Sequence, residues 1–261
     1  MVRRPPRSTR KESSAASDVY KRQGYVLYFY NTNLNNITFR DLEMNSTASR
    51  TVYLYNYYNT SYPNINIVFE DCQIEAGTSS SAYCPVYLYP YYYGSPTDFT
   101  FDGCEIIGGY YGIYFYPYYN QSSILKLTVN DCEIKDFNYM GLYLYGYQAY
   151  PELEITNNLV QSSSSSNNPY GLYGYYTGAG SKVIGNNFEL HGNNYTYGVL
   201  MYYGQGTASQ PIEIINNIIN STNPNGSYSQ YGLRVGYGYH YKVYHNTMKI
   251  SNNYGSSYGL Y

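Results

Sequence analysis

Hydrophobic and polar residues alternate with a period of two in short stretches that recur along most of the chain. In GLYLYGY, residues 141–147, an aliphatic residue and a tyrosine follow one another in strict alternation. Such alternation is typical of a β-strand with one face toward the core and the other toward solvent. Clusters rich in Gly, Asn, Pro and Ser, such as SSSSSNNPYG, separate the stretches, and no segment keeps a helical period. The pattern predicts an all-β protein built from short strands.

Two motifs repeat in step along the chain, with a mean spacing of about 29 residues. The first is the alternating stretch, which opens at Leu27, Val52, Val86, Ile113, Leu142, Leu172, Val199, Leu233 and Leu260. The second lies between these stretches, and its fourth residue is Leu42, Cys72, Cys104, Cys132, Asn158, Asn187, Asn217 or Asn246. A fixed period of this length indicates a solenoid, and the absence of helical segments favours coils of parallel strands stacked on one another. We expect the residues of each set to form one continuous column.

The residues of these two motifs resemble those of a known repeat family. The second motif reads ITNNLV, IGNNFELHG and IINNIINST in three repeats, each followed by YGLYGYY, YGVLMYY or YGLRVGY. With these residues, the chain from about residue 24 to residue 261 resembles the right-handed parallel β-helix of the pectin-lyase-like superfamily. The resemblance implies a single domain, a single-stranded parallel β-helix of about eight to nine coils of roughly 29 residues each. Because lyases, hydrolases, adhesins and toxins share this solenoid, the resemblance does not imply one function.

The alternation predicts which side chains of the first motif are exposed. The opening aliphatic residue and the residue two positions later are expected to point inward, and the tyrosines between and after them outward. Stacked coils lie about 4.8 Å apart, a spacing at which aromatic rings can stack. We therefore expect two outward ladders. The first ladder is Tyr28, Tyr53, Tyr87, Tyr114, Tyr143 and Tyr173, and the second ladder is Tyr30, Tyr55, Tyr89, Tyr116, Tyr145, Tyr175 and Tyr202. The candidate ligand-binding residues are Tyr87, Tyr89, Tyr114, Tyr116, Tyr143, Tyr145, Tyr173 and Tyr175.

Glycine, asparagine and cysteine columns accompany the ladders. Glycines just before the strand are expected to supply a turn that needs a small side chain or a positive φ; they are Gly112, Gly141, Gly171, Gly198, Gly232 and Gly259. The asparagines of the second motif resemble the asparagine ladder of the family, which implies an inward corner where their side chains bond the backbone of neighbouring coils. The three cysteines in the same column are predicted to be reduced and to fill the core. No Cys-x-x-Cys pair points to a metal.

Carboxylates gather beside the cysteine column and leave two interpretations open. Asp41, Asp71 and Asp131 share one position, and Glu43, Glu105 and Glu133 lie two residues later. Stacked like charges could hold calcium between them. Alternatively, the column is a solvated outer face on which each Asp bonds its own turn. We favour the second interpretation and predict no cofactor.

Composition and charge narrow the class of partner. The chain holds 43 tyrosines and no tryptophan, only 12% of its residues are charged, and it has no apolar run long enough for a spanning helix.

Residues 1–23 lack the repeat and contain RRPPRST and SSAASDVYKRQ, which resemble translated sequencing adapters. We therefore expect a non-native tail without packed contacts; the alternative is a native basic arm. Residues 24–261 then keep 8 Lys/Arg and 15 Asp/Glu, a net charge of −7, which disfavours nucleic acid as a partner. Because the repeat is cut at residue 261, we expect this domain to be truncated at both ends.

Candidate chemistry is sparse, which leaves enzymatic activity uncertain and disfavoured. The segment RVGYGYHYKVYH supplies Arg234, Tyr239, His240, Lys242 and His245, which could serve β-elimination or could be solvent-facing loop residues. The tyrosine ladders lack the two flanking carboxylates of a glycoside hydrolase, and the hydrolase signatures of the superfamily, an Asp-Asp pair and a Gly-His-Gly triplet, are absent.

The function predicted from these features is binding. The repeats look like those of adhesin-like β-helix proteins, which implies an extracellular or cell-surface protein that binds a polysaccharide or cell-surface glycan through its tyrosines. The alternatives are a polysaccharide lyase or glycoside hydrolase, and a purely structural stalk. Sequons support the extracellular setting; they occur at Asn36, Asn45, Asn59, Asn120, Asn194, Asn220 and Asn225.

Overall fold

The computed structural model describes most of the repeat region. It covers residues 25–30, 35–47, 49–56, 65–78, 80–90, 97–118, 125–147, 149–163, 166, 168–223, 228–252 and 255–261. The tail at residues 1–23, and the sequons at Asn59, Asn120 and Asn225, lie outside the described residues.

Three parallel sheets, which we name A, B and C, form the solenoid. Sheet A contains β1 (Leu27–Tyr30), β4 (Arg50–Asn56), β7 (Cys84–Pro90), β10 (Tyr111–Phe115), β13 (Met140–Tyr145), β16 (Tyr170–Tyr175), β19 (Thr196–Tyr202), β22 (Gln230–Gly236) and β25 (Ser257–Leu260). Sheet B contains β2 (Ile37–Arg40), β5 (Ile65–Glu70), β8 (Thr97–Asp102), β11 (Leu125–Asn130), β14 (Glu152–Thr156), β17 (Lys182–Ile184), β20 (Ile212–Ile215) and β23 (Tyr241–Tyr244). Sheet C contains β3 (Glu43–Ser46), β6 (Gln73–Ala76), β9 (Glu105–Gly108), β12 (Glu133–Phe137), β15 (Leu159–Ser162), β18 (Asn187–His191), β21 (Ile218–Asn223) and β24 (Thr247–Asn252).

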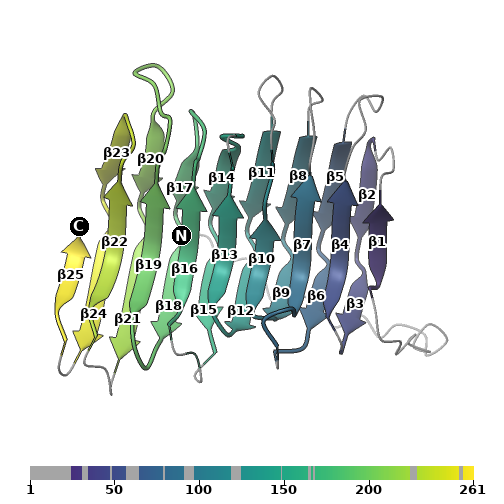
Figure 1. Cartoon of the computed structure of the whole chain (residues 1–261), viewed down its shortest axis with the longest axis horizontal. Coiled ribbons are helices and arrows are strands. Elements are labelled where there is room, and N and C mark those ends of the chain that lie inside the picture. The colour runs from purple at the N-terminus through teal and green to yellow at the C-terminus, as the bar shows by residue number, and fades with distance from the viewer. Residues whose placement is uncertain are drawn as a thin grey trace, which may run out of the picture.

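Each coil contributes one strand to each sheet in the order A, B, C. Figure 1 shows the strands of sheet A side by side in chain order, from purple β1 to yellow β25. All pairings are parallel, and the described residues contain no helix. The register aligns like with like, so Ile113 pairs with Leu142 and Tyr114 with Tyr143. The predicted parallel β-solenoid is confirmed.

The core lies between the three sheets and is filled by the inward side of each alternation. Val52 and Leu54 of β4 are 1% exposed, whereas Tyr53 between them is half-buried on the outer face. Sheet B adds a stack of phenylalanines, in which the ring centroids of Phe69 and Phe101 lie 4.9 Å apart with their planes 1° apart. Burying one such side chain contributes about 1.5–3 kcal/mol. The inward and outward assignments for the first motif are therefore correct.

The glycine column is needed for close packing and not for a turn. None of these glycines has a positive φ. A Cβ atom on Gly112 would lie 2.6 Å from the carbonyl oxygen of Gly141 in the next coil and 2.7 Å from Cγ2 of Ile134 in sheet C. These glycines lie within strands of sheet A, so the predicted turn was wrong. The predicted need for a small side chain is confirmed at Gly112, because sheets A and C approach each other closely there.

The turn from sheet B to sheet C holds a ladder of asparagines at the inward corner. Asn158 donates its Nδ2 to the carbonyl oxygen of Val129 at 2.9 Å and to Oδ1 of Asn186 at 2.9 Å. Asn186 bonds Asn217 in the same way, and Asn217 bonds Asn246. The ladder was predicted, but with Asn187 in place of Asn186.

The error at Asn187 is a slip of one residue. Val183 pairs with Ile155 in sheet B, so the turn of this coil begins one residue earlier than the motif IGNN suggests. Gly185, with φ 72°, takes the left-handed position that Asn157 holds in the preceding coil, and Asn186 follows it into the ladder. Asn187 is the first residue of β18 and pairs with Leu159.

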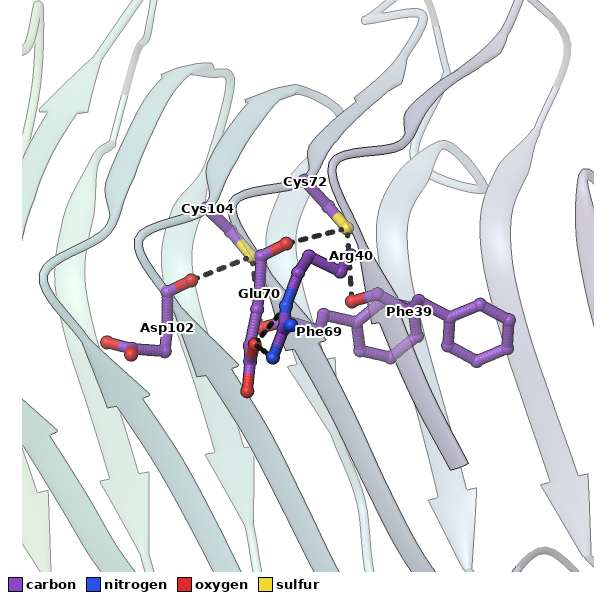
Figure 2. A network of polar contacts seen from close by, with 7 residues as sticks. All are labelled: Phe39, Arg40, Phe69, Glu70, Cys72, Asp102 and Cys104. Atoms are coloured by element: carbon purple, nitrogen blue, oxygen red, sulfur yellow. Dashed lines mark hydrogen bonds and ion pairs between the residues drawn. The ribbon is translucent and has the colours of Figure 1, made fainter. Parts of the chain in front are cut away.

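Cysteines continue the asparagine ladder into the earlier coils. The backbone N–H of Cys132 donates to Oδ1 of Asn158 at 2.9 Å, and that of Cys104 donates to the sulfur of Cys132 at 3.4 Å. Figure 2 shows the thiols of Cys72 and Cys104 directed at backbone carbonyl oxygens, which for Cys72 are those of Phe39 and Glu70. All four cysteines, Cys84 of β7 included, are buried and free, as predicted for the three in the column. At the end of the column, Leu42 is 41% exposed.

Candidate functional site

The outer side of sheet A carries the two tyrosine ladders, and we call this surface the tyrosine face. The register places Tyr87, Tyr114 and Tyr143 of the first ladder on adjacent strands in one row. Successive centroid separations along the first ladder are 5.3 Å for Tyr28–Tyr53, 5.1 Å for Tyr53–Tyr87, 4.5 Å for Tyr87–Tyr114, 4.8 Å for Tyr114–Tyr143 and 5.4 Å for Tyr143–Tyr173. Four of these contacts are stacked, and only Tyr53–Tyr87 is edge-on, with 69° between the planes.

The second ladder runs beside the first. Its rings stack from Tyr30 to Tyr175, but the predicted next step fails, because Tyr175 and Tyr202 meet edge-on at 6.4 Å with 78° between their planes. Its rings stack at 6.0 Å for Tyr30–Tyr55, 5.2 Å for Tyr55–Tyr89, 5.4 Å for Tyr89–Tyr116, 5.1 Å for Tyr116–Tyr145 and 4.9 Å for Tyr145–Tyr175. Within a coil, the two ladders also touch, as in Tyr143 and Tyr145 at 6.1 Å. The eight predicted binding residues therefore lie together in one two-dimensional array of rings.

Stacking covers the flat faces of these rings. Each ring in the middle of a ladder has a neighbour above and below, so all eight candidate residues are half-buried although they point outward. What remains accessible are ring edges and the ends that carry the phenol groups. Desolvation by the neighbouring rings raises the pKa of Tyr89 to about 12 and that of Tyr173 to about 12. The phenols therefore stay protonated at neutral pH and keep a hydrogen to donate.

A further tyrosine column borders the first ladder and was not predicted. It consists of Tyr170, Tyr197, Tyr231 and Tyr258, with centroid separations of 4.5, 4.8 and 4.9 Å. These residues lie two positions before the opening aliphatic residue, where the recurring pair Tyr-Gly in YGL and YGV could have identified them. On the other border, Tyr118 and Tyr147 stack at 4.8 Å.

A third unpredicted column turns the corner at the end of sheet A. Tyr176, Tyr203 and Tyr237 have φ values of 59°, 54° and 52°. Successive ring centroids lie 5.2 Å apart, with the planes tilted by 32° in the first pair and stacked in the second. A positive φ is unfavourable for a bulky side chain and is found where the surroundings enforce it. Each of these tyrosines directly follows a strand, β16, β19 or β22, and lies in the turn after it. The aromatic surface therefore extends beyond sheet A.

Charge on the tyrosine face is only positive. The nine strands of sheet A contain no Asp or Glu, and their only charged residues are Arg50 and Arg234. The guanidinium of Arg50 lies 3.9 Å from the ring centroid of Tyr87, and that of Arg234 lies 5.1 Å from that of Tyr231, both cation–π contacts. The Nε of Arg234 is buried and has no hydrogen-bond partner in the described part of the chain.

The structure does not gather the candidate catalytic cluster. Arg234 lies on sheet A, Tyr239 and His240 lie in the connection to β23, and Lys242 lies on sheet B with its Nζ 3.8 Å from Oε1 of Glu213. His245 occupies the turn toward sheet C, with its ring against that of Tyr244 at 5.2 Å. These five groups are spread around the coil, so the arrangement presents no shared site for a substrate.

The carboxylate columns form turns and ion pairs. Asp41, Asp71 and Asp131 have φ values of 54°, 52° and 54°, which places them in the left-handed position of the turn between sheets B and C. Glu105 forms an ion pair with Lys135. Among the residues that the structure describes, no group of three or more His, Cys, Asp or Glu side chains could hold a metal ion.

Comparison with known proteins identifies the repeat. A family model described as "Right handed beta helix region" matches residues 91–260. No curated protein and no solved structure matches the chain. In the described ranges, no helix is long and apolar enough to cross a membrane.

Proposed function

The chain belongs to the right-handed β-helix family, and from this premise we propose that it is an adhesin-like extracellular or cell-surface protein whose tyrosine face binds an extended glycan. The observation that carries the proposal is the continuous pair of tyrosine ladders on sheet A. Both ladders place a phenol in every coil from β1 to β16, so this part of the face offers similar contacts again and again along the solenoid axis. A repeating polymer matches such a surface better than a compact ligand does. The exposed sequon residues Asn36 and Asn45 support the extracellular location.

Ring edges and hydroxyl groups make the contact in this proposal. A sugar cannot lie flat on a ring in the middle of a ladder, because the neighbouring rings already cover both faces. A phenol can donate one hydrogen bond and accept others, and sugar hydroxyls have the same capacity. Each such bond contributes only about 0.5–1.5 kcal/mol, so useful affinity requires many of them along an extended chain.

The two arginines favour a glycan with anionic groups. Both lie on a face without carboxylates, while the rest of the repeat region is acidic. Arg50 is in the second strand of sheet A and Arg234 in the eighth, so six coil steps of about 4.8 Å separate them along the axis. Complementary charge at both sites would orient an acidic chain along the ladders.

A structural stalk is the second candidate function, and the ring stacking favours it. Stacked aromatic pairs contribute about 0.5–1.5 kcal/mol each beyond the area that they bury. Tyrosine is also a good strand former. The same ladders could therefore serve only to hold coil on coil.

Paired substitutions separate the two functions. Tyr114→Phe/Tyr143→Phe/Tyr173→Phe keeps the rings and removes three hydroxyls, whereas the corresponding Thr variant keeps strand propensity and removes the rings. For glycan binding, we expect the Phe variant to lose signal on a glycan array while its melting temperature stays near that of the wild type. An unchanged array signal in both variants, with a lower melting temperature only for the Thr variant, would establish the stalk.

A further inference from the structure

Closely stacked tyrosines come from neighbouring coils. Tyr87 of β7 and Tyr114 of β10 have ring centroids 4.5 Å apart and planes 3° apart. In the second ladder, Tyr89 and Tyr116 stack in the same two coils at 5.4 Å and 10°. Two phenols per coil are thus held against their equivalents in the next coil, in a fixed register set by the sheet.

We propose that the ladders are an oxidative modification site, at which adjacent coils become covalently joined through dityrosine. The co-reactant is a one-electron oxidant of the peroxidase class with hydrogen peroxide. Each of two phenols loses one electron and releases its proton, which gives two phenoxyl radicals. The radicals couple through the ring carbons next to the oxygen-bearing carbons, and one carbon–carbon bond forms. The hydrogens on those carbons then return to the oxygens as the rings regain aromaticity. Peroxide takes up both electrons and both protons and leaves as water.

Stacking directs where the coupling occurs. A radical can exchange with a neighbouring phenol without net reaction, because an electron and a proton pass from one to the other. Along a ladder each ring touches the next, so a radical formed at any position reaches a closely packed pair. The separation of 4.5 Å between Tyr87 and Tyr114 leaves only a side-chain rotation before their ring carbons meet. Random coupling would instead favour the most accessible rings, which include Tyr237 at 74% exposure and Tyr239 at 64%.

The product would act as a cross-link between coils. A solenoid coil contacts only its neighbours, so its stability depends on each interface between successive coils. A covalent bond between β7 and β10 would restrict the unfolded chain in the way that a disulfide does. This proposal does not depend on glycan binding, because it uses only ring geometry and phenol chemistry.

The test treats dilute protein with horseradish peroxidase and hydrogen peroxide. We expect dityrosine fluorescence in the monomer band of a denaturing gel and a rise in the melting temperature. Cleavage after glutamate separates residues 76–105, which hold Tyr87 and Tyr89, from residues 106–133, which hold Tyr114 and Tyr116. Mass spectrometry should find these two peptides joined, with the loss of two hydrogens.

Two double variants identify the reacting residues. Tyr114→Phe/Tyr116→Phe keeps both rings and should lose most of the joined peptide. Tyr237→Phe/Tyr239→Phe removes the two most exposed phenols of the described residues and should leave the joined peptide at its wild-type yield. Dityrosine confined to covalent dimers, or a joined peptide that survives the first variant and disappears in the second, would overturn the proposal.

Discussion

Asn158 and Asn186, which lie 28 residues apart in the chain, are joined by two hydrogen bonds to one oxygen. The Nδ2 and the backbone N–H of Asn158 both donate to Oδ1 of Asn186, at 2.9 and 3.0 Å. Asn186 also donates its Nδ2 to the carbonyl oxygen of Ile155 at 2.9 Å. One side chain therefore satisfies buried backbone groups of a neighbouring coil that water cannot reach.

Replacing Asn186 should be far more costly than replacing the asparagine beside it. Asn186→Ala leaves buried donors and an acceptor without partners, at about 1–3 kcal/mol for each group, so we expect the free energy of unfolding to fall by about 3 kcal/mol or more. Within the described residues, the side chain of Asn187 bonds only Oε1 of Glu189, at 2.9 Å, and Asn187→Ala should change the free energy of unfolding by less than about 1 kcal/mol. Urea unfolding of the two variants measures both. Equal losses would mean that the ladder contributes nothing specific to stability.

The slip at Asn187 shows how far a repeat can be read from sequence. Alternation and period were enough to assign the tyrosine ladders, because the strands of sheet A stay in register from coil to coil. The turn after sheet B holds Gly185 in one coil where five other coils have Asn or Asp, and two consecutive asparagines follow it, so either of them fits the motif. Only the pairing of Val183 with Ile155 resolves the register.

Contacts across the core could not be predicted at all. The atoms that a Cβ on Gly112 would meet belong to sheet C and to the next coil. The distance between the sheets depends on how every core side chain packs. The stacking of the tyrosine ladders, by contrast, was predicted, because the spacing of about 4.8 Å between coils suits stacked rings. The tyrosine columns at the borders of sheet A were missed.

The glycine column offers a second stability prediction with a control in the same column. A Cβ atom on Gly141 would lie 2.6 Å from Cγ1 of Val160 and 2.9 Å from the carbonyl oxygen of Gly171. Gly141→Ala should therefore destabilise the protein by about 1–3 kcal/mol, the usual cost of overpacking. The Cβ of Gly259→Ala would meet nothing nearer than Sδ of Met248 at 3.9 Å and should have little effect. Thermal unfolding of both variants checks this, and comparable shifts would show that close approach is not the reason for glycine.

Alkaline pH should unfold the solenoid as its ladder tyrosines ionise. Burial raises the pKa of Tyr53, Tyr89 and Tyr173 to about 12, from the usual value of 10.0. A group whose pKa is higher in the folded state stabilises that state fully below its unfolded pKa, and this stabilisation is lost as pH rises through the folded pKa. Stability should therefore be constant up to about pH 9 and fall steeply between about pH 10 and 12.

Phenolate absorbance and circular dichroism, recorded together, measure this transition. Phenolate should appear in step with unfolding. A titration of most tyrosines near pH 10 with the β-signal intact would show that the ladders do not exclude water.

Removing the arginines of the tyrosine face should weaken binding of acidic glycans selectively. Arg50→Gln/Arg234→Gln removes the only two charges in the strands of sheet A, whereas Lys182→Gln/Lys242→Gln changes net charge equally on sheet B, where Lys242 already lies near Glu213. A charge-assisted hydrogen bond contributes about 1.5–3 kcal/mol, so losing one at each end of the ladders should lower affinity for a polyuronate by more than about tenfold.

Titration calorimetry at low and moderate salt would measure this, because the salt dependence should shrink in the arginine variant and persist in the lysine variant. Equal losses in the two variants would mean that overall charge, and not the tyrosine face, governs the interaction. Binding of a neutral glycan should be the same in both variants, since both tyrosine ladders remain intact.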